Sequence, residues 1–232
     1  MGSLLLLGAG GGNAAPPSGF ALTWRGHADT EEDQTTYTFA GCAIGSEREG
    51  RIVSVAIAMG TVSNTQITSV TIGGVAATAR VTEQFASGRI AECWDAVVPT
   101  GTTADIVITH SVASNSRISI DWWTITGGVY SARSGNFPDI QTSATSITST
   151  AVTVPSGGGA IALCRIGLTS VPSLAWSQTS GSGTKHTDEA GGDAGLRVTT
   201  YDTLAAGSQQ FTVTQTGTAA QMRILAVAYG PA

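Results

Sequence analysis

Short apolar runs, many of them alternating hydrophobic with polar residues, cover most of this chain and restrict its fold more than any other feature. Examples are RIVSVAIAM, ADIVITHS, RISIDWWTIT and MRILAVAYG, which are bounded by Gly, Pro, Asn or Ser. A period of two residues is typical of β-strands, and no segment sustains the 3.6-residue period of an amphipathic helix. The sequence therefore predicts an all-β fold with very little helix.

The charge content supports this interpretation and excludes one class of partner. Charged residues make up 12% of the 232 residues, whereas about a quarter is usual for soluble domains. Abundant Gly, Ser, Thr and Val suit short strands and tight turns better than helices. The formal net charge is -5 and the pI is near 5.0. Because nucleic-acid binding depends on Lys and Arg that neutralise phosphates, we expect no nucleic-acid partner.

Two halves of the chain resemble each other at an offset near 106 residues. RIAECWDAVVPTGTTADIVITHS aligns with LRVTTYDTLAAGSQQFTVTQT, and SRISIDWWTITG aligns with QMRILAVAYG, which places Trp123 over Tyr229. A repeat of this length predicts two related antiparallel β-sandwich units of the jelly-roll or immunoglobulin-like kind. One continuous sandwich with similar halves is the alternative. The expected division is an N-terminal arm at 1–18, units at 19–128 and 146–232, and a Gly/Ser-rich linker at 129–145.

Alternation also predicts which side chains fill the cores between the sheets of each unit. The fourteen expected core residues are Ile52, Val53, Val55, Ile57, Val70, Ile72, Ile106, Ile108, Ile118, Ile120, Ile161, Leu163, Val213 and Ile224.

The N-terminal segment MGSLLLLGAGGGNAAPP carries four consecutive leucines, Leu4, Leu5, Leu6 and Leu7, followed by glycines and two prolines. A secretory signal needs a basic residue and an apolar stretch of roughly 7–15 residues, and a membrane span needs about 20. No Lys or Arg precedes Arg25. We therefore expect neither an export signal nor membrane insertion, but an arm that docks on a neighbouring subunit. A disordered tail, which would normally be polar, is the alternative interpretation.

Residues with catalytic or metal-binding chemistry are scattered along the chain. His27, His110 and His186 lie in separate segments, and Cys42, Cys93 and Cys164 form no C-x-x-C pair. We expect the cysteines to be small buried hydrophobes, with a disulfide as the alternative. No cofactor motif is present, and we expect no cofactor.

Two acidic clusters present further alternatives. The segment HADTEED contains Asp29, Glu31, Glu32 and Asp33, oxygen ligands that suit calcium, but it lacks the glycine-punctuated spacing of a calcium loop. We expect a solvated loop there and no metal site. The segment GTKHTDEAGGDAG places His186, Asp188, Glu189 and Asp193 in a glycine-rich turn, where a hydrolytic site would use a carboxylate pair for acid-base catalysis. Nothing in the spacing fixes such a geometry, and we expect no enzyme.

Adjacent tryptophans in IDWWTI provide the stronger functional signal. Neighbouring residues of a strand point to opposite faces of the sheet, so Trp122 and Trp123 cannot share one core. One expectation is that one of them faces outward, as a platform for a glycan or a partner subunit. The alternative is that both sheet faces are covered, one by the core and the other by the second unit or a neighbouring protomer.

The runs YTFAGCAIG, GRIVSVAIAM, ITSVTIGGVAAT, VPTGTTADIVITHS and IDWWTITG resemble structural proteins of tailed-bacteriophage and prophage virions. The resemblance is strongest over residues 36–127 and rests on strand and turn patterns, so it transfers no active site. It implies a virion component, assembled in the bacterial host cytoplasm, whose arm at Leu4 to Leu7 inserts into other virion proteins. The implied role is a tail fibre or baseplate component, a homo-oligomer with a trimer favoured, that contacts the host surface and its glycans.

Other functions stay open at this point. A capsid decoration or head-fibre protein would use the same arm to hold the capsid lattice. A polysaccharide-degrading enzyme would use Asp95, Asp188, Glu189 or Asp193, but depolymerases usually have longer, repetitive chains. An extracellular adhesin would need an export route.

Overall fold

The structure is a computed structural model that describes ten ranges: 19–60, 66–84, 89–114, 117–133, 144–167, 174–178, 184–188, 195–201, 204–219 and 221–232. Within these ranges the chain forms nineteen β-strands and no helix. The described residues accordingly include no helix that could cross a membrane.

The first nine strands form two antiparallel sheets. An outer sheet has the order β2-β8-β4-β5, and a first inner sheet has the order β1-β9-β3-β7-β6. Their bounds are β1 Ala21–Thr30, β2 Gln34–Ala43, β3 Ile52–Gly60, β4 Ile67–Ile72, β5 Val75–Ala76, β6 Thr78–Gln84, β7 Arg89–Val97, β8 Thr103–Ser114 and β9 Arg117–Thr126.

The remaining strands repeat this arrangement. A second inner sheet has the order β10-β19-β13-β16-β15, and it faces the outer strands β11-β18-β14 and β12-β17. Their bounds are β10 Gly128–Arg133, β11 Ala144–Thr148, β12 Val152–Val154, β13 Gly159–Gly167, β14 Leu174–Gln178, β15 Thr184–Asp188, β16 Gly195–Tyr201, β17 Gly207–Gln209, β18 Phe211–Ala219 and β19 Gln221–Pro231.

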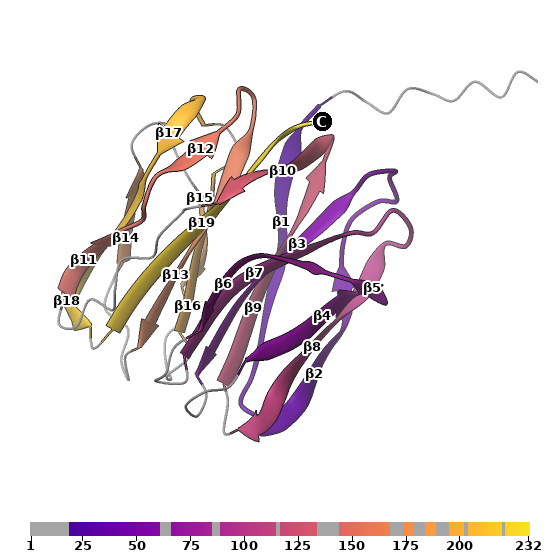
Figure 1. Ribbon diagram of the computed structural model, residues 1–232, viewed down its shortest axis with the longest axis horizontal. Coiled ribbons are helices and arrows are strands. Elements are labelled where there is room, and N and C mark those ends of the chain that lie inside the picture. Colours follow the sequence, from indigo (N-terminus) through magenta and orange to yellow (C-terminus); the bar gives the residue numbers. More distant parts are fainter. Residues whose placement is uncertain are drawn as a thin grey trace, which may run out of the picture.

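These sheets stack in four layers, with the two inner sheets face to face in the middle (Figure 1). One core lies between the outer sheet and the first inner sheet, and another lies between the second inner sheet and its outer strands. A third core joins the two inner sheets and contains Trp123, Ile125, Leu225 and Tyr229. The two sandwiches therefore share a continuous apolar interface.

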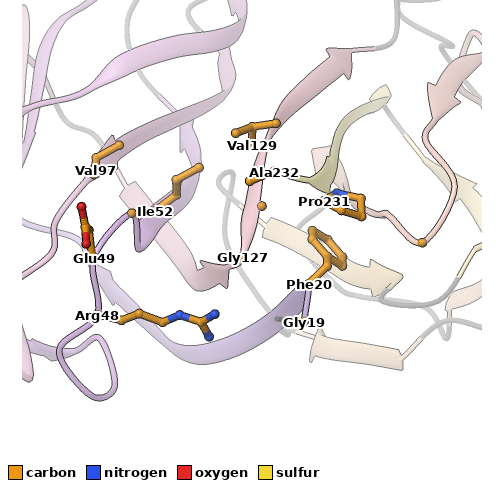
Figure 2. Close-up of a pocket in the computed structure, with 13 residues that line it drawn as sticks. Gly19, Phe20, Arg48, Glu49, Ile52, Val97, Gly127, Val129, Pro231 and Ala232 are labelled. Atoms are coloured by element: carbon orange, nitrogen blue, oxygen red, sulfur yellow. The ribbon is translucent and has the colours of Figure 1, made fainter. Parts of the chain in front are cut away.

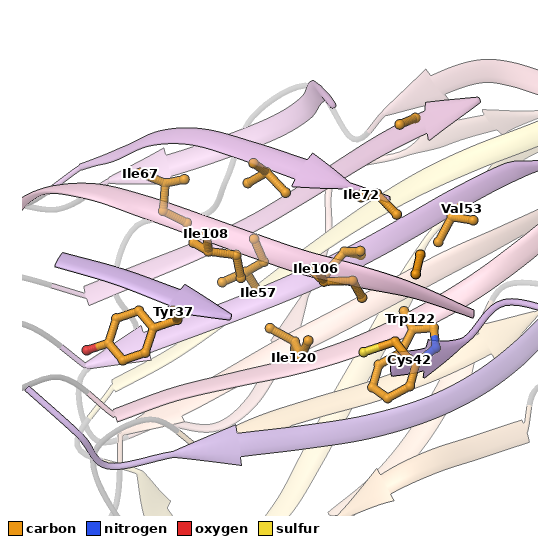
Figure 3. Packing of buried hydrophobic residues seen from close by; sticks show 14 of the residues in the cluster. Tyr37, Cys42, Val53, Ile57, Ile67, Ile72, Ile106, Ile108, Ile120 and Trp122 are labelled. Carbon is orange, nitrogen blue, oxygen red and sulfur yellow. The ribbon is translucent and has the colours of Figure 1, made fainter. Parts of the chain in front are cut away.

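The position of β3 explains its composition. It pairs with β7 on one side and β9 on the other, and sheets cover both of its faces. All nine of its residues are buried, so its sequence is an apolar run broken only by Ser54. Figure 3 shows Ile57 in the core with Ile106 and Ile108 of the outer sheet.

A glycine on β1 makes room for one of the tryptophans. The pairing of β1 with β9 shifts register between Trp24 and Gly26. A Cβ atom at Gly26 would lie 2.5 Å from the Trp122 ring, so a larger residue there would displace the indole. The Trp122 Nε1 donates a hydrogen bond to the carbonyl of Ala43 at 2.8 Å. A bulge and a glycine thus fix this ring in the first core.

The all-β, sandwich-type fold is confirmed, and the strand order of the second unit repeats that of the first. β13 begins 107 positions after β3, at Gly159 against Ile52, and β19 begins 104 positions after β9. Trp123 and Tyr229, which the repeat aligns, both lie fully buried in the core between the inner sheets. The N-terminal arm lies outside the described residues.

All fourteen predicted core residues are buried. Ile52, Ile161 and Leu163, however, point into the core between the units rather than into a core within one unit. The segment 129–145 also differs from the expected linker, because it contains most of β10 and the start of β11. β10 pairs with β19, so it is the edge strand of the second inner sheet.

Trp123→Ala should lower the free energy of unfolding by about 3–5 kcal/mol, because it removes a large ring from the fully buried core between the sandwiches. Urea denaturation followed by circular dichroism measures this without using the lost fluorophore. Val75→Ala, at a position 40% exposed on β5, is the control and should change stability by less than about 0.5 kcal/mol. A cost below about 1 kcal/mol at Trp123 would contradict the shared core.

Candidate binding pocket at the end of the stack

A pocket of about 740 Å³ opens at one end of the stack, where the two sandwiches meet. Phe20, Ile52 and Val97 come from the first sandwich, and Val129 and Pro231 come from the second (Figure 2). Turns and strand ends supply the remaining lining: Gly19, Arg48, Glu49, Gly50, Gly127, Gly128, Gly157 and Ala232. The volume is within the range of pockets that enclose small ligands, roughly 300–1,000 Å³.

Exposed apolar side chains make this pocket a candidate binding surface. Among the side chains that the structure describes, the large hydrophobic ones that stand exposed are Val75, Val97 and Val129. Val97 is 53% exposed and Val129 is 48% exposed, and both line the pocket. Single exposed hydrophobic residues are common, but two on one concave apolar wall indicate an interaction site.

A buried arginine holds one wall of the pocket in place. Arg51 is fully buried, and its guanidinium donates five hydrogen bonds of 2.7–2.8 Å to the backbone carbonyls of Gly45, Ser46, Val98, Thr100 and Gly101. All five N–H groups of the side chain are thereby used. Since the loop between β2 and β3 carries Arg48 and Glu49, Arg51 fixes both charged residues at the pocket.

The tight turn between β9 and β10 forms another wall. Gly127 has a φ of +61°, and a Cβ atom there would lie 2.6 Å from the carbonyl oxygen of Gly19. The close approach of these two backbones requires glycine at this position. The Gly127 carbonyl also accepts a hydrogen bond of 3.1 Å from the amide of Ala232. The turn thus brings the start of β1 and the end of β19 to the same pocket.

Neither tryptophan is available as a glycan platform. Trp122 is 7% exposed and belongs to the first core, while Trp123 is fully buried between the inner sheets. The expectation of an outward-facing indole is therefore wrong, and the alternative, in which the second unit covers the other face, is the observed arrangement. Leu4, Leu5, Leu6 and Leu7 lie outside the described residues.

Among the acidic residues that the sequence marked, those whose side chains the structure describes form no metal site. Asp29, Glu31, Glu32 and Asp33 are exposed around the β1–β2 turn. Within the part of the chain that the structure describes, no three His, Cys, Asp or Glu side chains gather to hold a metal ion. Asp188 is the last residue of β15, and the structure describes its backbone but not its side chain. Glu189 and Asp193 lie outside the described residues.

His27 has a structural role that the sequence did not indicate. The carboxylate of Asp121 on β9 is fully buried. It accepts a hydrogen bond of 2.8 Å from Trp24 Nε1, and its second oxygen lies 3.1 Å from His27 Nδ1. Both partners come from β1, the edge strand of the first inner sheet, so these contacts reinforce its pairing with β9.

A polar network crosses the core between the sandwiches. Arg80 on β6 holds the buried carboxylate of Asp95 on β7, with its Nε 2.8 Å from each oxygen and its Nη2 2.7 Å from Oδ1. The hydroxyl of Tyr229, from β19, lies 3.1 Å from Asp95 Oδ2 and 2.9 Å from Ser54 Oγ. Burial raises the pKa of Tyr229 well above its ordinary value, so the hydroxyl stays protonated and donates to the carboxylate.

A residue of the second sandwich extends this network on its outer side. The Arg80 guanidinium carbon lies 4.5 Å above the centre of the Tyr130 ring, a cation–π contact with β10. The Tyr130 ring meets the Tyr229 ring edge to face at 6.3 Å. Arg80 and Asp95 therefore bind two aromatic residues of the second sandwich. Because Arg80 and Tyr229 both bind its carboxylate, Asp95 has a structural role.

Sequence reasoning missed both the pocket and the network for the same reason. Each is assembled from strand ends and side chains of both units, and the packing of one unit on the other does not follow from strand periodicity. The available signal for the network was that two polar residues, Ser54 and Asp95, stand within otherwise apolar strands that are buried.

Comparisons with known proteins identify no family for this chain. No family model and no curated protein matches it. A conserved protein of unknown function from Pseudomonas aeruginosa is similar at 11% identity and a TM-score of 0.33, over 94% of this chain and 89% of that one.

Two further solved structures are similar at lower scores. A turret protein of Sulfolobus turreted icosahedral virus has 15% identity and a TM-score of 0.23, over 88% of this chain and 97% of that one. A β-porphyranase of glycoside hydrolase family 86 from Bacteroides plebeius has 13% identity and a TM-score of 0.27, over 87% of this chain and 36% of that one. None of these scores supports an inference about function. The class that fold and pocket define is a tandem β-sandwich protein with its inner sheets packed face to face.

Arg80→Met should lower the free energy of unfolding by on the order of 3 kcal/mol, because it leaves the buried Asp95 carboxylate without its cation. The double variant R80M/D95L should recover most of that loss, since it removes both charges and Tyr229 keeps Ser54 as a partner. Urea denaturation measures both. A double variant no more stable than R80M would contradict the coupling.

Burial raises the pKa of Cys42 to about 11 and that of Cys93 to about 12, from an ordinary value of 9.0. Because the thiolate is the reactive form, neither thiol should react with Ellman's reagent in the folded protein at pH 8. Unfolding in urea should make both thiols reactive. A native Cys93 that reacts at once would contradict its burial.

The same pKa values predict a pH dependence of stability. Since only the unfolded chain loses these two thiol protons near pH 9, the free energy of unfolding should fall as the pH rises above about 9.

Proposed function

We propose that this protein is a non-enzymatic structural component of a tailed-bacteriophage virion, a tail fibre or baseplate subunit attached through its N-terminal segment. The observation that carries the proposal is the position of the apolar pocket: Gly19, where the described chain begins, is part of its wall. The pocket, the start of the described chain and the end of β19 therefore lie at one end of the stack, so a protein attached there would project the rest of the block away from the attachment point.

The shape and packing of the stack support a load-bearing role. Three apolar cores join four layers without a break, and both inner sheets are covered on each face. A subunit built this way transmits force through β-sheet packing rather than through a hinge between domains. The strand and turn patterns that resemble virion structural proteins lie largely in the first of these sandwiches.

The role of Asp95 favours a structural protein over a polysaccharide-degrading enzyme. A general acid or base must reach the proton that it transfers. Asp95 is buried and is bound by Arg80 and Tyr229, so it cannot approach a sugar in this structure. Release of reducing sugar from purified host polysaccharide would overturn the proposal.

The location in the particle is tested by labelling. Antibody raised to residues 18–232 is bound to intact particles, detected with gold and viewed by electron microscopy. Label at the tail tip supports the tail assignment, and label spread over the head would replace it with a capsid decoration role. An absence of label from every particle would reject the virion proposal.

Deletion of residues 1–17 should abolish incorporation into particles while the truncated protein stays soluble and folded. The physical reason is that the four leucines supply the apolar surface for attachment, on the order of 6–10 kcal/mol gross if all are buried. Immunoblots of purified particles measure incorporation, and circular dichroism of the purified protein checks folding. Val75→Asp in the full chain is the control and should incorporate normally. Normal incorporation of the truncated protein would contradict attachment through the arm.

A further inference from the structure

We infer that, in the unassembled protein, the segment Leu4–Leu7 of each chain docks into that chain's own apolar pocket. The contact lies within one molecule and can form whatever the role of the protein, whereas its use as a store for the attachment segment rests on the proposed function. In this contact the leucines cover the exposed side chains of Val97 and Val129 and are themselves buried from water.

The tether is the first argument for the chain's own segment. Gly19 and Phe20 line the pocket, and eleven residues, 8–18, separate Leu7 from Gly19. A flexible chain of that length has a root-mean-square span of about 17–20 Å, and its fully extended reach is about 36–40 Å. The leucines can therefore return to the pocket without strain. A short tether also sets an effective concentration in the millimolar range, which a second molecule in dilute solution cannot match.

The chemistry of the pocket is the second argument. Phe20, Ile52, Val97, Val129 and Pro231 form an apolar wall, and Arg48 and Glu49 are the two charged residues in the lining. An apolar cavity of about 150 Å³ holds one benzene-sized group, so about 740 Å³ has room for several leucine-sized side chains. In an extended segment, alternate side chains point the same way, so Leu4 and Leu6, or Leu5 and Leu7, would enter together.

The function of this contact is to store the attachment segment. A run of four leucines exposed on every free subunit would favour aggregation before assembly. Held in the pocket by a weak intramolecular contact, the segment is shielded until an acceptor protein offers it a larger apolar surface. Docking in the free protein and release on assembly are then two states of one segment.

Hydrogen exchange on the full chain tests the contact. In the wild-type protein, the amides of residues 4–7 should exchange at least about tenfold more slowly than in a free peptide of the same sequence. Val129→Asp places a carboxylate on the apolar wall and should restore the peptide rate. Val75→Asp, at an exposed position on β5 away from the pocket, is the matched control and should leave the protection unchanged.

The same experiment distinguishes the occupants. Protection that is equal at low and high micromolar protein concentration supports docking within one chain. Protection that appears only at high concentration would overturn it in favour of a segment from a second copy. Wild-type exchange at the peptide rate, or protection that survives Val129→Asp, would overturn docking in this pocket altogether.

A disulfide trap gives an independent readout. The variants L5C/V129C and L6C/V129C place a thiol on each face of the extended segment, opposite a thiol in the pocket. At least one should form a cross-link within a single chain under mild oxidation, detected by mass spectrometry of the monomer. The native cysteines Cys42, Cys93 and Cys164 are all buried and should not compete, and the raised pKa values of Cys42 and Cys93 make those two thiols still less reactive. Cross-linked dimers alone, or no cross-link in either variant, would overturn the proposal, whereas particle labelling would be unaffected by either result.

Discussion

The whole architecture depends on covering both faces of two inner sheets. A strand such as β3 carries apolar side chains on both faces, with Ser54 as the exception, so a single sandwich would leave one of these faces in water. Packing the inner sheets against each other removes both exposed faces at once. Trp123 is the clearest consequence, because an indole on the outer face of an isolated sandwich becomes the centre of a third core. The tandem repeat is therefore a requirement of the sequence pattern and not merely a duplication.

Polar groups inside this shared core define how the sandwiches meet. An apolar interface alone tolerates sliding, whereas a hydrogen bond to a buried carboxylate has one good geometry. Tyr229 reaches Asp95 and Ser54 across the interface. Towards the other end of the strands, Arg165 of β13 donates a 3.2 Å hydrogen bond to the carbonyl of Met59 on β3. Two separated polar contacts between the same pair of sheets fix both position and rotation.

Strand periodicity was sufficient to predict the all-β class, the repeat and the buried positions, because burial on a sheet is a local property of alternate residues. It failed for Trp122 and Trp123, since alternation says that they face opposite sides but not what covers the second side.

Sequence composition also misled for residues 129–145, where the Gly and Ser content suggested a linker. Gly128–Arg133 is an edge strand, and edge strands need only one hydrogen-bonded partner and few apolar residues. The pocket could not be predicted, because its walls come from turns whose approach depends on Gly127 and Arg51.

Closing the faces of the stack leaves its ends as the places where apolar surface can remain accessible. A sheet end is formed by turns, whose side chains cannot pair with a neighbouring layer, and here two sandwiches end side by side. Arg51 stiffens one loop through five carbonyls, and Gly127 lets another turn contact the start of β1. Arg51 lies in the first sandwich and the Gly127 turn leads from that sandwich into β10 of the second, so the position of both walls depends on the shared core that joins the sandwiches. A substitution that changes how the sandwiches pack, for example at Tyr229, would therefore alter the shape of the pocket as well as the stability of the protein. Packing in the interior of the stack thus affects the binding of any segment at its end.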